Sequence, residues 1–357
     1  MGLFFISVIC ILWAMAATVM AWLVCAFPAL PRRALLLVLP ILLTAFIIGG
    51  IAYSRSHYHA GTGVLYYAAY ILFGFLFIAF CAAAVSLFLY WVLGILHAPR
   101  VWLGPTNTLF ILAACGLAVW GGFSEPKLKI IRVNSPQMPK LKIALLSDSH
   151  LGRGVSLARF DKALSRLQAQ QPDVLLVLGD VFEYGQNREK YAERIKNFSA
   201  PLGKYGVLGN HEYYSGYENS VQFYKEAGIT LLQNELTQLP NGVQVAGLKD
   251  IKTARVTPQE IGQLLQQADP QRPLILLSHT PLYAEEAAEA GADLMFSGHT
   301  HNGQIWPFEY LVKLQFPRVY GLFDIDGLKF YITSGMFYWG IPLRFLTSAE
   351  LPVIEVN

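Results

Sequence analysis

The chain has 357 residues, of which 54% are hydrophobic, and a formal net charge of +3 at pH 7. This hydrophobicity excludes a disordered chain, and the small net charge lacks the strong positive field expected of a nucleic-acid-binding protein. The charges are distributed unevenly, since residues 1–122 contain four arginines, no lysine and none of the 24 acidic residues. We therefore predict two domains, a membrane domain over residues 1–122 and a water-soluble domain over residues 123–357.

Four apolar stretches in the first domain have the length of membrane-spanning helices, which need about 20 apolar residues to cross the hydrocarbon core. None of them contains Asp, Glu or Lys, which disfavours a transporter or a proton relay because such proteins usually place ionisable groups inside their spans. Residues 1–5 lack the positive charge of a cleaved secretory signal, so we expect the first helix to be retained. The predicted all-α transmembrane domain has spans at residues 3–27, 34–53, 64–95 and 102–120.

The arginines between these spans bear on the side of the membrane that the second domain occupies. Arginines at positions 32, 33 and 100 lie on one side and Arg55 lies on the other. Basic residues at positions 127, 129 and 132 follow the last span, and we assign them to the folded domain. Without them, the positive-inside rule favours an extracytoplasmic C-terminal domain on an inner (cytoplasmic) membrane; including them reverses this prediction.

From about residue 123, short apolar runs alternate with polar or helical segments, as is typical of an α/β domain. Five of these runs end directly in polar residues, and all five histidines of this half lie in the segments that follow them. Because ligands bind at the carboxyl ends of strands in α/β proteins, we expect these side chains to meet at one edge. The runs are 143–146, 174–178, 205–208, 274–277 and 294–296, followed by Ser147-Asp148-Ser149-His150, Gly179-Asp180, Gly209-Asn210-His211-Glu212, Ser278-His279 and Ser297-Gly298-His299-Thr300-His301.

Each of these motifs alone is ordinary, but their joint occurrence predicts a metal site. On an extended backbone, the spacing of His299 and His301 would point both imidazoles to one side, which suits two ligands in one cluster. Carboxylate, amide and imidazole ligands without thiolate favour Mn, Fe or Zn. The ligands are too many for one ion, and two divalent metal ions about 3.5–4 Å apart are suited to phosphoester hydrolysis. The candidate ligands are Asp148, His150, Asp180, Asn210, His279, His299 and His301.

This ordered set of motifs resembles that of the calcineurin-like metallophosphoesterase superfamily, with its D-x-H, G-D, G-N-H-[ED], H and G-H-x-H pattern. The resemblance covers about residues 141–357 and implies a four-layer α/β/β/α sandwich with the site at the strand ends. It also implies that His211 is no principal ligand and instead contacts the leaving group or stabilises the transition state. The implied ligands are Asp148, His150, Asp180 and His301 for one metal, and Asp180, Asn210, His279 and His299 for the other, with Asp180 as the bridge.

The sequence is also similar to the membrane-associated bacterial YkuE-like subgroup, through the GHTHNGQ motif at 298–304 and the WGIPLR segment at 339–344. That subgroup more usually has Gly where Asn302 stands. Since position 302 is not a ligand, this difference bears on loop shape or substrate preference. Glu183 stands where the family often has an acidic or amide residue, and we assign it no role from the sequence.

Two further segments each admit two interpretations. Residues 308–323 interleave aromatic and aliphatic residues with Lys313 and Arg318. This segment could form a lipid-binding face, which rests on the bilayer or holds an acyl chain, or it could pack in the core. Arg153, between two glycines just after His150, could pair with a phosphate or be a solvated loop residue.

The sequence thus predicts a membrane-anchored, metal-dependent phosphoesterase that hydrolyses a phosphoester or pyrophosphate. A lipid-linked substrate is attractive because the anchor confines the site to the bilayer surface, so the expected partners are the lipid bilayer and a phosphate-containing substrate, with no nucleic acid. The alternative is a noncatalytic membrane scaffold or receptor with a metal-stabilised domain. His211 argues against it, because structural metal sites are typically closed four-coordinate sites that need no additional donor.

Overall fold

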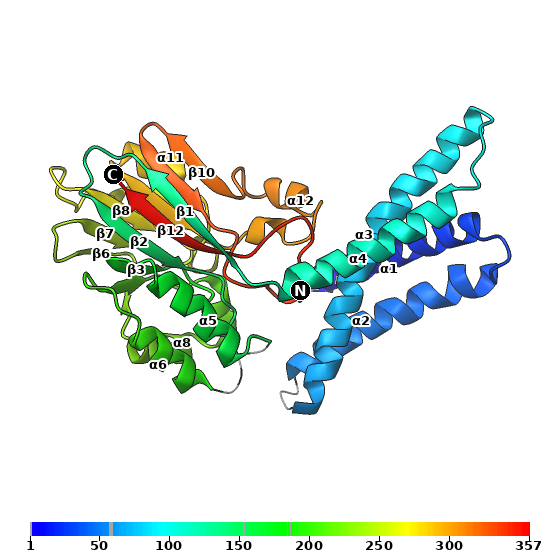
Figure 1. Cartoon of the computed structure of the whole chain (residues 1–357), viewed down its shortest axis with the longest axis horizontal. Helices are drawn as coiled ribbons and strands as arrows, with labels where there is room; N and C mark the ends of the chain where they lie inside the picture. Colours follow the sequence, from blue (N-terminus) through cyan, green and yellow to red (C-terminus); the bar gives the residue numbers. More distant parts are fainter. Residues whose placement is uncertain (1, 57–59, 153, 184, 186) are drawn as a thin grey trace. The chain divides into compact units, whose positions relative to one another are not determined.

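The computed structural model describes residues 2–56, 60–152, 154–183, 185 and 187–357 (Figure 1). Arg153, one of the residues with two interpretations above, lies outside them. The chain divides into two compact units. One comprises residues up to Phe123 together with Gly340–Phe345, and the other comprises Ser124–Trp339 together with Leu346–Asn357.

The first unit is built from four long helices that are apolar on all sides, as expected for helices surrounded by lipid. By length and composition, each is able to cross a membrane, which agrees with the four predicted spans. Buried side chains join three of them, including Trp22, Ile47 and Ala83. The helical elements are α1 (Gly2–Ala26), the π-helical turn η1 (Ala34–Val38), α2 (Leu39–Ser56), α3 (Ala60–Ile95) and α4 (Leu103–Phe123).

A short segment from late in the sequence completes this helical unit. The backbone N–H of Arg344 donates a hydrogen bond of 2.9 Å to the carbonyl oxygen of Ala118 in α4. Arg344 and Leu343 are both buried. Gly340–Phe345 therefore packs as part of the membrane unit, although its neighbours in sequence on both sides belong to the second unit.

The second unit contains two six-stranded mixed sheets. The strand order is β1-β12-β2-β3-β4-β5 in the first sheet and β10-β11-β9-β8-β7-β6 in the second. The strands are β1 (Lys127–Val133), β2 (Leu141–Leu146), β3 (Val174–Val177), β4 (Lys204–Gly206), β5 (Thr230–Leu231), β6 (Glu235–Gln238), β7 (Gln244–Gly247), β8 (Leu274–Leu277), β9 (Leu294–Ser297), β10 (Gly321–Ile325), β11 (Leu328–Ile332) and β12 (Glu350–Val356).

Helices cover the outer faces of both sheets, and Figure 1 shows α5, α6 and α8 together on the face of the first sheet. The remaining helices follow the strands as connections or as short turns in loops. The helices are α5 (Leu157–Gln168), α6 (Arg188–Lys196), α7 (Asn210–Ser215), α8 (Tyr217–Glu226), α9 (Ile251–Ala254), α10 (Pro258–Leu265), α11 (Ala284–Glu289), the 3-10 turn η2 (His301–Gly303) and α12 (Glu309–Lys313).

Strand β2 shows why the unit has four layers. Ile143 and Leu145 lie in the core between the two sheets, whereas Ala144 and Leu146 lie in the core that the first sheet shares with its helices. Successive side chains of a strand point to opposite faces, so a strand covered on both faces reads as a continuous apolar run. A third core joins the second sheet to α10 and α11, which completes the predicted α/β/β/α sandwich.

The five strands that the sequence predicted to end in functional residues are present, but they belong to two sheets. Strands β2, β3 and β4 are parallel neighbours in the first sheet, and β8 and β9 are parallel neighbours in the second. Strand β4 ends at Gly206, two residues before the predicted end. The expected single edge is therefore formed by the carboxyl ends of strands from both sheets.

Candidate metal centre

The loops that carry the candidate ligands have an unusual backbone. Five of the seven candidates have a positive φ, a conformation that is uncommon for residues other than glycine. Such conformations cost energy, and they cluster where the surrounding structure holds a functional geometry. The five are Asp148 (φ 51), His150 (φ 41), Asp180 (φ 53), His299 (φ 73) and His301 (φ 48).

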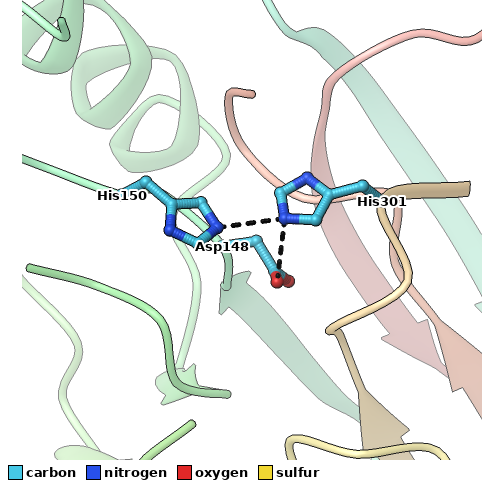
Figure 2. Close-up of side chains that lie close together, drawn as sticks. All are labelled: Asp148, His150 and His301. Atoms are coloured by element: carbon cyan, nitrogen blue, oxygen red, sulfur yellow. Dashed lines mark hydrogen bonds and ion pairs between the residues drawn. The ribbon is translucent and has the colours of Figure 1, made fainter. Parts of the chain in front are cut away.

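One cluster consists of Asp148 and His150, from the loop after β2, and His301, from the segment after β9, and Figure 2 shows the three side chains close together. Nε2 of His150 lies 3.0 Å from Nε2 of His301, which in turn lies 3.3 Å from Oδ1 of Asp148. All three side chains are buried. Burial raises the pKa of Asp148 despite the histidines nearby, so this carboxyl group needs a positive charge beside it to stay ionised.

A second cluster brings Asp180, His279 and His299 together, and Asn210 joins it. Oδ2 of Asp180 lies 3.2 Å from Nε2 of His279. Oδ1 of Asn210 lies 3.2 Å from Nε2 of His279 and 2.9 Å from Nδ1 of His299. Burial, together with the charge of His279, lowers the pKa of His299 to about 3, so its ring is neutral and can act as a ligand.

The hydrogen bonding of His279 tests whether this donor set fits a metal ion. Its Nδ1–H group donates a 2.8 Å hydrogen bond to the carbonyl oxygen of Leu178. A neutral ring therefore directs a lone pair from Nε2 at the oxygens of Asp180 and Asn210. Burial would lower the pKa of His279, but Asp180 and other carboxylates raise it well above its usual value. Both observations describe oxygens and a nitrogen lone pair that converge on one point, and such a set of donors fits a metal ion.

Asp180 lies between the two clusters. Its Oδ2 is 3.2 Å from Nε2 of His279 and 4.0 Å from Nε2 of His150. Burial would raise the pKa of Asp180, but the neighbouring histidines hold it well below the usual value. The other oxygen, Oδ1, accepts a 2.9 Å hydrogen bond from the backbone N–H of His211, which fixes the carboxylate. This position suits the bridging role that the family resemblance implies.

The expectation that His299 and His301 share one cluster on an extended backbone is wrong. Strand β9 ends at Ser297, and both histidines have a positive φ, so they project into different clusters. Gly298 permits this turn, because a Cβ atom there would lie 2.2 Å from Oδ2 of Asp148. The loop between β9 and η2 therefore supplies one candidate ligand to each cluster.

Glu183 connects His211 to the first cluster, a role that the sequence analysis did not assign. Its Oε1 lies 2.6 Å from Nδ1 of His150 and 2.7 Å from Nδ1 of His211. Burial would raise the pKa of Glu183, but the two histidines hold it far below the usual value. Burial would lower the pKa of His211, but the negative charges of Asp180 and Glu183 raise it to about 9. The spacing of Glu183 from the Gly-Asp motif was its only sequence signal.

Glu212 holds two of the motif loops together, a role that the sequence motif did not reveal. Its side chain accepts backbone hydrogen bonds from Gly209 at 2.8 Å, Asp180 at 2.9 Å and Val181 at 2.7 Å. Burial, reinforced by the charge of Asp180, raises its pKa to about 7. Glu212 thus ties the loop after β3 to the start of α7, which positions Asp180 relative to Asn210.

Comparison with known proteins agrees with this geometry. A family model described as calcineurin-like phosphoesterase matches residues 141–303. A protein of Helicobacter pylori (strain J99) named as an uncharacterized metallophosphoesterase is 35% identical over 264 residues, which cover 69% of this chain and 69% of that protein. The chain belongs to the calcineurin-like metallophosphoesterase family.

Other members of the family support the resemblance to YkuE and the presence of membrane helices. The metallophosphoesterase YkuE of Bacillus subtilis is 29% identical over 231 residues, covering 60% of this chain and 79% of YkuE. A transmembrane protein with metallophosphoesterase domain from Bos taurus is 33% identical over 240 residues, covering 60% of this chain and 53% of that protein. With its four apolar helices, this metallophosphoesterase has the composition of a membrane protein.

Proposed function

We propose that this metallophosphoesterase is a membrane-anchored dinuclear enzyme that hydrolyses a phosphoester or pyrophosphate with a metal-activated water. The observation that carries the proposal is the pair of buried ligand clusters with Asp180 between them. Two divalent ions held in this way would acidify a water and neutralise charge on the phosphoryl oxygens. Mn, Fe and Zn suit these ligands.

Each side chain then has a defined task. One ion would be held by Asp148, His150, Asp180 and His301, the other by Asp180, Asn210, His279 and His299, as the distances within the two clusters support.

His211 would act at the leaving oxygen. Its Nδ1 faces Glu183, so Nε2 remains to donate a hydrogen bond or proton. Placing such a donor against developing charge is worth several powers of ten in rate in other enzymes. His211 supports the enzyme over the scaffold alternative, because a site that only held metal ions would not need it.

The membrane helices bear on the substrate and on its location. A site tethered to a bilayer meets lipid phosphates at high effective concentration, so we propose a lipid-linked phosphoester or pyrophosphate as substrate. We also propose an extracytoplasmic catalytic domain on an inner membrane. Its support is that Lys127, Lys129 and Arg132 all lie in strand β1, so they belong to the folded domain and do not count as loop charges.

Hydrolysis of two synthetic esters tests the enzyme. Detergent-purified full-length protein, stripped of metal and resupplied with Mn, Fe, Zn or Mg, should cleave p-nitrophenyl phosphate or its bis ester. Asp180→Asn and His299→Ala should abolish this activity, whereas Asp161→Asn, at an exposed ion pair with Arg194, should retain it. Full activity of both site variants would overturn the proposal. Inactive protein that still holds metal by elemental analysis would favour the metal-stabilised scaffold.

A further inference from the structure

The short helix α12 carries a group of exposed apolar side chains that the proposed chemistry does not use. Helix α12 buries none of its residues, and Figure 1 shows it beyond the strand ends rather than over a sheet face. Single exposed apolar residues are normal, but five large ones within nine positions are unusual for a water-facing loop. These residues, which we call the α12 surface, are Trp306 (41% exposed), Phe308 (42%), Tyr310 (55%), Leu311 (54%) and Leu314 (83%).

The α12 surface is held firmly against the metal-centre loop. Gly303, two residues after His301, has a φ of +68°, and a Cβ atom there would lie 2.5 Å from the backbone nitrogen of Glu309 at the start of α12. After the helix, Phe316 is buried, and its ring packs edge-on against His299 with 5.1 Å between centroids. The chain is thus fixed next to candidate ligands at Gly303, before the surface, and at Phe316, after it. The exposed side chains lie between these two points.

Trp339 extends this apolar surface to the leaving-group side of the site. Its backbone N–H donates to Oε1 of Gln304 at 2.8 Å, and its carbonyl oxygen accepts from Nε2 of Gln304 at 3.1 Å. The ring of Trp339 lies 5.7 Å from that of His211 and remains 46% exposed. His211 therefore has an exposed apolar ring as its neighbour.

Trp339 and Leu346 are joined directly in sequence to a segment of the helical unit. Trp339 and Leu346, which is 71% exposed, are the residues immediately before and after Gly340–Phe345, the segment that packs as part of the helical unit. Within that segment, Arg344 bonds to Ala118, five residues before α4 ends at Phe123, or about 8 Å along the helix axis. Helix α4 is one of the four candidate membrane spans. Gly340–Phe345 is bound near the end of this span, so Trp339 and Leu346 are tethered close to that end.

The composition of the α12 surface matches a lipid–water interface. Trp and Tyr prefer the headgroup region, where an apolar ring and a polar tip are both satisfied. Leucines add hydrocarbon contact, and Lys313 adds a positive charge near the phosphates. The ammonium of Lys313 lies 5.0 Å from the Tyr310 ring centroid, and the side chain is 49% exposed.

We propose that the α12 surface, with Trp339 and Leu346, inserts into the lipid–water interface and places the metal centre against lipid headgroups. This surface would exist whether or not the centre hydrolyses phosphoesters, so its test needs no turnover. If the proposed function also holds, the surface explains how the apolar part of a lipid phosphoester stays in the bilayer while its phosphate reaches the centre.

Fluorescence of labelled full-length protein in lipid nanodiscs tests the proposal. The four cysteines at positions 10, 25, 81 and 115 are replaced by alanine, and a polarity-sensitive NBD label is attached at Leu314→Cys or Leu311→Cys. The matched control is Gln271→Cys, an exposed position before β8 and thus at the sheet edge opposite the metal centre. Circular dichroism and gel filtration confirm that each variant is folded.

We expect a blue-shifted emission at 311 and 314, several-fold stronger quenching by doxyl lipids than at 271, and several-fold weaker quenching by iodide. Iodide access at 311 and 314 equal to that at 271 would overturn the proposal. Protection from both quenchers would also overturn it, because the surface would then be covered by protein and not by lipid.

Discussion

Glu183 shows how one carboxylate can set the state of two histidines at once. It accepts hydrogen bonds from Nδ1 of both His150 and His211, so it fixes which nitrogen of each ring faces the reaction. Partners of this kind orient ligands and raise their basicity. In the proposed mechanism, the same oxygen would support metal binding through His150 and proton donation through His211.

The substitution Glu183→Gln keeps the shape of this side chain and removes its charge. We expect metal affinity to fall about 10-fold or more, because the orientation of His150 is weakened. At saturating metal, we expect kcat to fall about 100-fold or more, because His211 loses the partner that stabilises its protonated form. Kinetics across a metal titration separate the two effects.

The control for this prediction is Glu189→Gln, a change in the first turn of α6, away from the clusters. It should leave both quantities unchanged. If Glu183→Gln lowered neither metal affinity nor kcat, Glu183 would only fill space between the two rings.

At the scale of elements, the candidate metal centre lies at the ends of strands, and the sequence predicted these strands in the right order. The candidate motifs follow buried apolar runs directly, so local pattern was enough to place Asp148, Asp180 and His279 in the candidate clusters. What the sequence could not predict depends on long-range packing. Strand assignment to two sheets and the contact of Trp339 with His211 are set by residues far apart in the chain.

The two interpretations of residues 308–323 show the same limit. Phe316 is buried, as core packing predicts, but Leu311 and Leu314 are exposed. The sequence therefore showed that this segment is rich in apolar residues, but it did not show which of them are buried. Only the position of α12 beyond the strand ends decides which side chains face outward.

The turn from β9 to η2 gives a prediction at this scale. Gly298→Ala would place a methyl group 2.2 Å from both Oδ2 of Asp148 and Oγ of Ser147. We expect a loss of about 1–3 kcal/mol in the free energy of unfolding, as for other overpacked sites. Metal binding should also weaken, because the turn carries a candidate ligand to each cluster.

Calorimetric or fluorescence melting and metal titration measure these two losses. The matched control is Gly262→Ala, within α10, where an added Cβ would have nothing within 4 Å. Because alanine favours helix over glycine, that change should stabilise the protein by up to about 1 kcal/mol. Equal effects of the two substitutions would contradict the tight approach at Gly298.

For the whole molecule, metal binding should couple to stability. Two buried carboxylates and four candidate histidine ligands lie close together, so removing metal leaves their charges and lone pairs unbalanced. A ligand that binds only the folded state at 100 times its Kd stabilises it by about 2.7 kcal/mol. We expect chelation to lower the melting temperature and Mn, Fe or Zn to restore it. A melting temperature unaffected by chelation, in protein shown to lose its metal, would contradict this coupling.

The orientation of the whole chain can be tested with two cysteines in the cysteine-free background. Helix α4 has 21 residues and is about 32 Å long. With α4 as a membrane span, a label at Pro99→Cys, in the hinge before it, and one at Gln271→Cys lie on opposite sides of the membrane. Each position is therefore the control for the other. Because Arg32, Arg33 and Arg100 are expected in the cytoplasm, a membrane-impermeant maleimide should label intact cells at 271 and label 99 only after permeabilisation. The reverse result would place the metal centre in the cytoplasm and would mean that the basic residues of β1 outweigh the hinge arginines in setting the topology.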